Sequence, residues 1–281
     1  MVDGRQGEGG MSEKAYRRVL TIAGSDCGGG AGIQADLKTF AANGCYGMSV
    51  ITALTAQNTQ GVTGIHPVPV EFVERQLDAV LGDIGADAVK IGMLYSAELI
   101  AAVAGKLRAY GVQRIVADPV MVAQSGDKLL QDDAVEALKT HLFPLAEIIT
   151  PNLPEAAVLL GREVAGAADM ETAAADLLQW GSRHVLVKGG HLEADGSEDV
   201  LVSAGSPGAE RFGDERIQTR NTHGTGCTLS SAIAAHLAKG EGVTEAVGHA
   251  KEYIRRAIRA GAGYRIGHGH GPVHHFWPFW E

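Results

Sequence analysis

The residues best suited to chemistry lie in one short stretch, 221–228, which reads Asn-Thr-His-Gly-Thr-Gly-Cys-Thr. An apolar run at helical spacing follows, so the stretch should open a helix. First-turn amides of a helix lack partners and carry partial positive charge, which suits an anion such as phosphate. Gly224 and Gly226, on either side of Thr225, have no side chains that would keep the anion away from these amides. The same position should lower the pKa of the Cys227 thiol. The alternative is an ordinary glycine-rich helix start.

Further polar residues follow runs that are typical of buried strands. Asp118 follows the run at 114–117, and Lys188 follows the run at 184–187. Open α/β sheets bind ligands at the carboxyl ends of their strands, so both positions are candidates for ligand contact. For Asp118, which precedes a proline, a plain turn is the alternative.

Two polar pairs have both a local and a functional explanation. Gln57 and Asn58 end a run rich in Val and Thr; they can bind the edge of a heteroaromatic ring or simply form a turn. Asn152 and Glu155 have the spacing of a helix capping box, so local structure explains them without a ligand. The residues alone leave both questions open.

The glycine-rich segment 24–36 lies between an apolar run and a predicted helix, and residues 30–35 match G-x-G-x-x-A. A dinucleotide site also needs an acidic residue about 20 positions further on. Residues 41–70 contain no Asp or Glu, so a nicotinamide oxidoreductase is disfavoured. The segment 104–107 comes nearest to a P-loop and does not match it. Any phosphate site should therefore be of another kind.

Strands and helices alternate along the chain, which predicts a three-layer α/β/α sandwich with a mostly parallel central sheet. The segment 46–56 and its short antiparallel partner 64–70 predict a small β extension. Strands are also expected at 18–24, 88–93, 114–117, 147–150, 184–187, 199–203 and 215–219. Helices are expected at 33–43, 71–81, 96–110, 132–142, 169–180 and 243–264, and from 151 and 225 onward. No linker divides residues 15–281, so we expect one domain.

Composition narrows the class of protein. The 281 residues include 24 basic and 33 acidic ones, a net charge of −9 that disfavours nucleic acid or an anionic membrane as the main partner. Three cysteines without a metal-site spacing favour a reduced, cytoplasmic setting. Residues 1–14 are expected to be a disordered leader, and Met11 is an alternative start.

The C-terminal segment 267–280 contains four histidines. They come without a carboxylate or a cysteine, so a metal site is disfavoured there. We expect Phe276 and Trp277 to pack this segment onto the body of the protein.

Taken together, these segments resemble the ribokinase-like superfamily, and within it the hydroxymethylpyrimidine/phosphomethylpyrimidine kinases of thiamine biosynthesis. The resemblance runs from Arg18 to the C-terminal segment. It rests on the segments 23–26, 32–39, 51–59, 90–94, 118–121, 151–152, 187–191, 223–227 and 269–273.

The resemblance implies a role for each candidate residue. A substrate aminopyrimidine would be surrounded by Gly24, Asp36, Gln57, Met93 and Val120, with the β extension partly covering it. Mg²⁺ and the ATP phosphates would be held by Asp118, Asn152 and Glu155, with Lys188 near the phosphates. The anion hole would consist of Gly224, Thr225, Gly226 and Cys227.

The resemblance also implies an ATP- and Mg²⁺-dependent kinase that is a homodimer or a higher homo-oligomer. It would phosphorylate 4-amino-5-hydroxymethyl-2-methylpyrimidine and then its monophosphate in the same pocket. A Cys227 thiolate would serve as base mainly in the first step, because a phosphate acceptor is already ionised near neutral pH. The alternatives are a pyridoxal or pyridoxine kinase of the same superfamily, and more remotely a non-catalytic ligand-binding protein.

Overall fold

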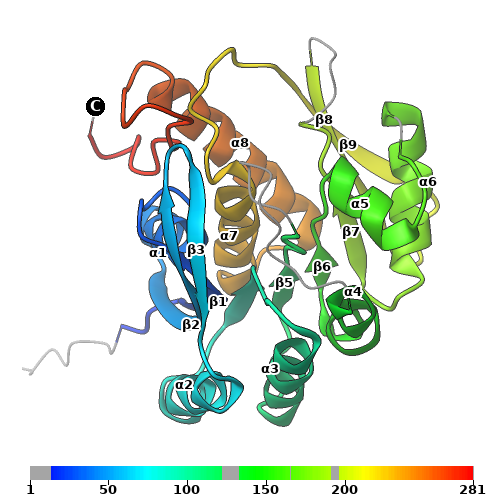
Figure 1. The fold of residues 1–281 in the computed structure, drawn as a ribbon. Coiled ribbons are helices and arrows are strands. Elements are labelled where there is room, and N and C mark those ends of the chain that lie inside the picture. The colour runs from blue at the N-terminus through cyan, green and yellow to red at the C-terminus, as the bar shows by residue number, and fades with distance from the viewer. Residues whose placement is uncertain (1–13, 122–132, 165, 191–195, 281) are drawn as a thin grey trace, which may run out of the picture.

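The computed structural model describes residues 14–121, 133–164, 166–190 and 196–280 (Figure 1). Its strands form a single sheet in the order β3-β2-β1-β4-β5-β6-β7-β8-β9. Neighbours from β2 to β7 pair in parallel, whereas β2–β3, β7–β8 and β8–β9 pair antiparallel. The bounds are β1 Arg18–Asp26, β2 Tyr46–Asn58, β3 Gly61–Pro67, β4 Ala88–Ile91, β5 Ile115–Ala117, β6 Ile148–Ile149, β7 His184–Val187, β8 Gly196–Ser203 and β9 Ala209–Glu215. The predicted, mostly parallel sheet is confirmed.

Helices lie on both faces of this sheet (Figure 1). They are α1 Gly32–Ala42, α2 Val70–Asp83, α3 Ala97–Ala109, α4 Ala134–Ala137, α5 Leu153–Leu160, α6 Ala167–Leu178, α7 Thr225–Ala238 and α8 Val243–Gly261. A π-helical turn, η1 (Leu138–Leu142), and a 3₁₀ turn, η2 (Phe143–Leu145), follow α4.

Two apolar cores separate the three layers, because side chains along a strand alternate between faces. Val19 packs in the core with α1, α7 and α8, whereas its neighbour Leu20 packs in the core with α2 to α6. Val116 and Ile115 divide between the two cores in the same way. The short parallel strands are buried on both faces, and this explains their continuous apolar sequences. The predicted three-layer sandwich is confirmed.

Two segments differ from the sequence-based expectation. The second strand of the 199–219 hairpin was expected at 215–219, but β9 covers Ala209–Glu215. This strand forms an edge of the sheet, and charged residues suit an exposed edge, so its sequence lacks the usual β signature. The helix expected at 132–142 is a short α4 continued by the π-helical turn η1; residue 132 lies outside the described residues.

The C-terminal segment packs against the body beside the β2–β3 hairpin (Figure 1). Trp277 lies against the core of α7 and α8, as expected. Phe276 instead stacks edge-on with Phe279, 6.4 Å away. His275 is buried, with Nε2 3.0 Å from Thr228 Oγ1. This segment therefore reaches the helix that begins at the glycine–cysteine turn.

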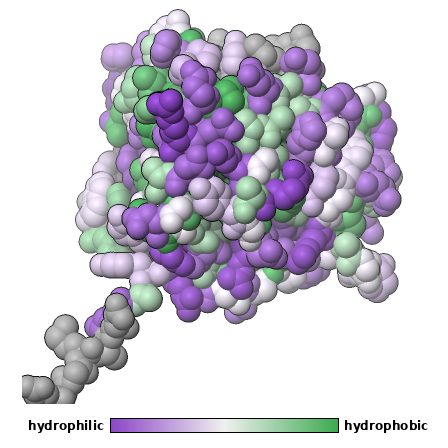
Figure 2. Space-filling model, turned by 90° about the horizontal axis from the view of Figure 1, so that it is seen from below, coloured by the Kyte–Doolittle hydropathy of each residue, from purple (hydrophilic) through white to green (hydrophobic). Residues whose placement is uncertain are grey.

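Among the described residues, no helix combines the length and apolarity needed to cross a bilayer. The end of the molecule viewed in Figure 2 mixes polar and apolar residues, and hydrophilic ones cover much of it. The three cysteines, Cys27, Cys45 and Cys227, are all free thiols.

Candidate active site

A cavity of about 760 Å³ lies at the carboxyl ends of the central strands. The chain leaves β1 toward β2 on one side and later returns to β4 on the other, so this is the position where open α/β sheets bind ligands. Its lining includes every sequence-predicted site residue except Asp36: Gly24, Gln57, Met93, Val120, Asp118, Asn152, Glu155, Lys188, Gly224, Thr225, Gly226 and Cys227.

One wall of the cavity is apolar. Met93 and Val120 form a small cluster with Ala53 and Ile65 of the β2–β3 pair, separate from the two main cores. Gly24 faces this wall so closely that a Cβ there would lie 3.1 Å from Met93 Sδ. Because Gly24 has no side chain, the end of β1 can pack closely against Met93 at this wall.

A polar group closes the β2 end of this wall. Gln57 Oε1 accepts a hydrogen bond from Thr55 Oγ1 at 3.1 Å, and Gln57 Nε2 lies 3.4 Å from His223 Nε2. His223 Nε2 in turn lies 2.9 Å from Asp26 Oδ2. Burial raises the pKa of Asp26, but hydrogen bonds from His223 and from backbone amides outweigh it, so that pKa is lowered. These contacts orient the Gln57 amide at the edge of the ring-sized space.

The glycine–cysteine turn begins α7, as predicted. Gly224 is the N-cap and has φ +79°, in the left-handed region that favours glycine. A Cβ on Gly224 would collide with the carbonyl oxygen of Gly30, so the two glycine-rich loops touch there. The amides of Gly226 and Cys227 belong to the first turn, where N–H groups lack intrahelical partners. This turn presents donors suitable for an anion to the cavity.

An acid–lysine cluster lies beside that turn. Lys188 Nζ donates to Asp118 Oδ1 at 2.7 Å and lies 4.0 Å from Glu155 Oε2. A Cβ on Gly226 would come within 3.4 Å of Lys188 Nζ, so the cluster and the helix start are adjacent. Thr150 Oγ1 donates to the same Asp118 carboxylate at 3.1 Å.

The pKa of Asp118 is lowered in this cluster, whereas the pKa of Glu155 is raised. Burial alone would raise the pKa of Asp118, but Lys188 and Lys90 lower it overall. Burial raises the pKa of Glu155 to about 7, helped by the neighbouring Asp118 charge and opposed by Lys188. Burial lowers the pKa of Lys188, but Asp118 and Glu155 raise it overall. A cation placed here would complete the ionisation of Glu155.

Asn152 and Glu155 form the predicted capping box at the start of α5. Asn152 Oδ1 accepts from the Glu155 amide at 2.8 Å, and Glu155 Oε2 accepts from the Asn152 amide at 2.8 Å. Both side chains also line the cavity. The local explanation and the functional one are therefore compatible. Carboxylate and amide oxygens are the ligands that Mg²⁺ prefers, so the donor set of Asp118, Asn152 and Glu155 fits this ion.

The prediction of an acidic Cys227 thiol is wrong. Cys227 keeps some exposure to the cavity, but burial of its sulfur raises the pKa to about 11. Lys90 and the backbone amide of Gly32 favour the thiolate, while the buried charges of Asp36 and Asp118 oppose it. At the helix start, desolvation outweighs the favourable dipole.

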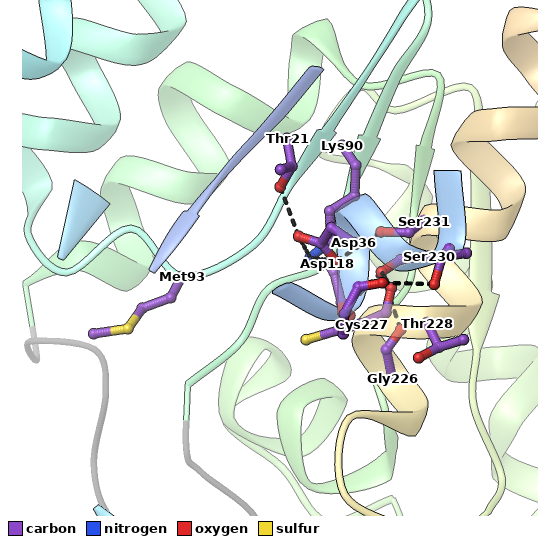
Figure 3. A network of polar contacts seen from close by, with 12 residues as sticks. Thr21, Asp36, Lys90, Met93, Asp118, Gly226, Cys227, Thr228, Ser230 and Ser231 are labelled. Carbon is purple, nitrogen blue, oxygen red and sulfur yellow. Dashed lines mark hydrogen bonds and ion pairs between the residues drawn. The ribbon is translucent and has the colours of Figure 1, made fainter. Parts of the chain in front are cut away.

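Asp36 has a different place from the one expected. Its side chain is fully buried and is absent from the described residues that line the cavity. Lys90 Nζ donates to both Asp36 oxygens at 2.9 Å. The Asp36 carboxylate also accepts hydrogen bonds from Thr21 Oγ1 at 2.6 Å and from Ser231 Oγ at 2.7 Å (Figure 3). With these partners Asp36 is the counter-charge of Lys90 and does not border the cavity. The expected direct contact of Asp36 with the substrate ring is therefore wrong.

Two residues with evident roles were not singled out from the sequence. Lys90 is fully buried in β4 but lines the cavity; burial lowers its pKa, yet Asp36, Cys227 and Asp118 raise it overall. A lysine within the apolar strand Ala88–Ile91 was the available signal, since such a charge requires a partner. His223 lies within the recognised motif, but its contacts with Asp26 and Gln57 join segments far apart in the sequence.

An α/β/α sandwich whose cavity is bordered by a glycine-rich helix start, an acid–lysine cluster and an apolar wall is typical of a ribokinase-like small-molecule kinase. The phosphomethylpyrimidine kinase family model matches residues 26–274. The chain belongs to the phosphomethylpyrimidine kinase family.

Individual relatives agree with this assignment. The hydroxymethylpyrimidine/phosphomethylpyrimidine kinase of Rhizobium meliloti is 55% identical over 264 residues, which cover 94% of this chain and 98% of that protein. The thiamine biosynthesis bifunctional protein ThiED of Geobacter sulfurreducens is 55% identical over 257 residues. That match covers 92% of this chain but 52% of ThiED, so the chain spans about half of that relative.

Solved structures share the fold. Phosphomethylpyrimidine kinase from Clostridium difficile has a TM-score of 0.76 and 46% identity, covering 86% of this chain and 99% of that one. Pyridoxal kinase from Staphylococcus aureus in complex with ADP has a TM-score of 0.86 and 37% identity, covering 95% and 96% of the two chains. The superfamily predicted from the sequence is thereby confirmed.

Proposed function

We propose that this protein uses ATP to phosphorylate 4-amino-5-hydroxymethyl-2-methylpyrimidine and then the resulting monophosphate, supplying the diphosphate for thiamine biosynthesis. The observation that carries the proposal is one cavity that joins an apolar, amide-edged pocket to an anion-binding helix start and an acid–lysine cluster. Relatives that are about as long as this chain and carry this activity in their names support it.

In this proposal the ring lies against the apolar side chains of Met93 and Val120, next to Gly24. The Gln57 amide, held by Thr55, binds the amino group and a ring nitrogen of the pyrimidine. An amide has both a donor and an acceptor, which suits an edge that carries both. Asp36 acts behind the site, as the partner of Lys90, rather than on the ring.

Phosphoryl transfer depends mainly on positioning and charge stabilisation. The Gly226 and Cys227 amides would receive the transferred group, with Lys188 beside them neutralising its charge. Asp118, Asn152 and Glu155 would hold Mg²⁺, which neutralises the negative charge of the ATP phosphates when bound. Each role assigned here follows from a side chain or amide that borders the cavity.

The two acceptors place different demands on Cys227. A phosphate monoester has a second pKa of about 6 and attacks as an anion at neutral pH. The alcohol of the first acceptor benefits from a base, and a thiol with a pKa of about 11 is rarely ionised there. We therefore propose that the first step accelerates with pH above neutrality more steeply than the second.

The test is ADP release with three acceptors in parallel: the hydroxymethylpyrimidine, its monophosphate and pyridoxal. We expect both pyrimidines to respond and Lys188→Met to reduce both rates at least 100-fold. Lys139→Met is the matched control, because Lys139 pairs with Glu136 at an exposed site away from the cavity. ADP release with pyridoxal alone would overturn the substrate assignment.

Cys227→Ala separates the two steps. We expect it to slow the first phosphorylation more than the second. An equal loss of both rates would overturn the proposal that Cys227 serves as the base. A homodimer and a cytoplasmic location also belong to the proposal, and light scattering on the purified chain tests the first of these.

A further inference from the structure

A cluster outside the active site places two imidazoles on one carboxylate. His236 lies in the last turn of α7, Glu241 in the connection to α8, and His249 in α8 itself. His236 Nδ1 is 2.8 Å from Glu241 Oε1, and His249 Nδ1 is 2.7 Å from Glu241 Oε2. Among the described residues this is the one group of three His, Cys, Asp or Glu side chains whose ligand atoms come this close together.

The local fold builds this arrangement. Gly240 has φ +96°, so the chain reverses sharply after α7. The Glu241 amide then donates to the His236 carbonyl at 3.3 Å, which directs Glu241 back over the end of the helix. The rings of His236 and His249 have centroids 4.9 Å apart, one from each helix. The cluster therefore joins α7 to α8.

We propose that His236, Glu241 and His249 form a binding site for a divalent transition-metal ion of the zinc class. One ligand atom from each residue lies within 4.8 Å of the others. With zinc–ligand bonds of about 2.1 Å, ligand atoms of a tetrahedral site are about 3.4 Å apart. The two N···O contacts need to open by less than about 1 Å, and the remaining ligand pairs, no more than 4.8 Å apart, need to close by less than about 1.5 Å to reach that spacing.

The donor set selects the kind of ion. Two imidazole nitrogens and one carboxylate suit Zn²⁺ or its neighbours, whereas Mg²⁺ and Ca²⁺ prefer oxygen ligands throughout. A neutral imidazole that binds the metal through Nδ1 carries its proton on Nε2, so binding requires a tautomer change and no redox step. The His249 side chain is 53% exposed, which leaves an entry path and room for a water as fourth ligand.

The site is distinct from the proposed Mg²⁺ position. His236 follows Cys227 by nine residues on the same helix, about 14 Å along its axis. Bound metal would cross-link the end of α7 to α8 and stabilise their packing. Because it binds the folded chain, zinc at 100 times its Kd should raise Tm by roughly 5 °C.

The experiment uses the full chain without an affinity tag, stripped with EDTA and kept in 1 mM Mg²⁺. Zinc is titrated against a chromophoric chelator, and Tm is measured with and without zinc. We expect one tightly bound zinc per chain, and at least 10-fold weaker binding in His249→Ala and in Glu241→Gln. His268→Ala is the matched control, since His268 is exposed in the histidine-containing tail.

X-ray absorption on the zinc-loaded chain gives an independent readout, and we expect two imidazole nitrogens in the coordination shell. The proposal is overturned if zinc binding is unchanged in His249→Ala and Glu241→Gln. It is also overturned if His268→Ala alone abolishes binding, or if zinc leaves the Tm of the wild-type chain unchanged.

Discussion

Replacing Asp36 with Asn should strongly destabilise the protein, because it removes the carboxylate that contacts the buried Lys90 ammonium. Lys90 and Asp36 are fully buried, and their side chains meet at 2.9 Å. In Asp36→Asn, Lys90 keeps its charge in a buried site and loses the carboxylate that it contacts. Breaking a buried pair in this way costs about 3–5 kcal/mol of unfolding free energy.

Lys90→Met and the double variant show how much of this loss of unfolding free energy comes from the interaction between the two residues. In Lys90→Met, Asp36 keeps its hydrogen bonds from Thr21 and Ser231, so the loss should be near the lower end of that range. In the double variant neither uncompensated charge remains. The double variant should therefore be more stable than the sum of the single losses predicts, with a coupling energy of about 2–3 kcal/mol.

Urea unfolding followed by circular dichroism measures this coupling, provided that the denaturant slope m stays constant. Asp78→Asn is the matched control, because Asp78 and Lys106 form a pair of similar length, 2.7 Å, on the surface. Its midpoint should change little. Additive losses at Asp36 and Lys90, with coupling below about 0.5 kcal/mol, would refute the reasoning.

Two further predictions concern protonation. Burial raises the pKa of the Cys227 thiol to about 11, so its alkylation by iodoacetamide at pH 8 should be roughly 100-fold slower than that of an ordinary thiol. The rate of alkylation should keep rising toward pH 11. Mass spectrometry with the exposed Cys27 as internal control measures this rate, and a plateau below pH 9 would contradict the prediction. His275 is buried, and its folded-state pKa is lowered to about 3, so the native state binds fewer protons than the unfolded state between about pH 6.5 and 3. Its stabilising contribution is present above about pH 6.5 and is lost as pH falls. Wild type should therefore lose about 2 kcal/mol between pH 7 and 5 relative to His275→Gln, and a pH-independent difference in urea unfolding would count against this.

The fold could be predicted largely because local signals and burial agree. Ser96 caps α3 by accepting from the Leu99 amide at 3.3 Å, and Gly111 follows that helix at φ +65°, as its sequence predicts. Strand β9 could not be located in this way. Its pairing, Val200 with Arg211 for example, depends on the neighbouring strand and not on its own composition.

For the site, the sequence identified which residues gather but not what surrounds each one. Cys227 occupies the predicted helix start, yet the sign of its pKa shift follows from desolvation, which the motif does not encode. Asp36 was expected on the ligand because of the resemblance to the kinase family. Its partner Lys90 is 54 residues away, so only the folded chain shows that the carboxylate is already occupied.

The C-terminal segment also matters for the order in which the protein is made. The amides of His268 and Gly269 donate to Thr59 Oγ1 at the β2–β3 turn, across more than 200 residues of sequence. On a ribosome, Gln57 and its hairpin emerge more than 200 residues before the residues that secure the hairpin tip. Closing so long a loop adds little entropic cost by its length alone, yet it cannot occur before synthesis has passed residue 269. A nascent chain can thus form most of its sheet while the hairpin that carries Gln57 still lacks this support.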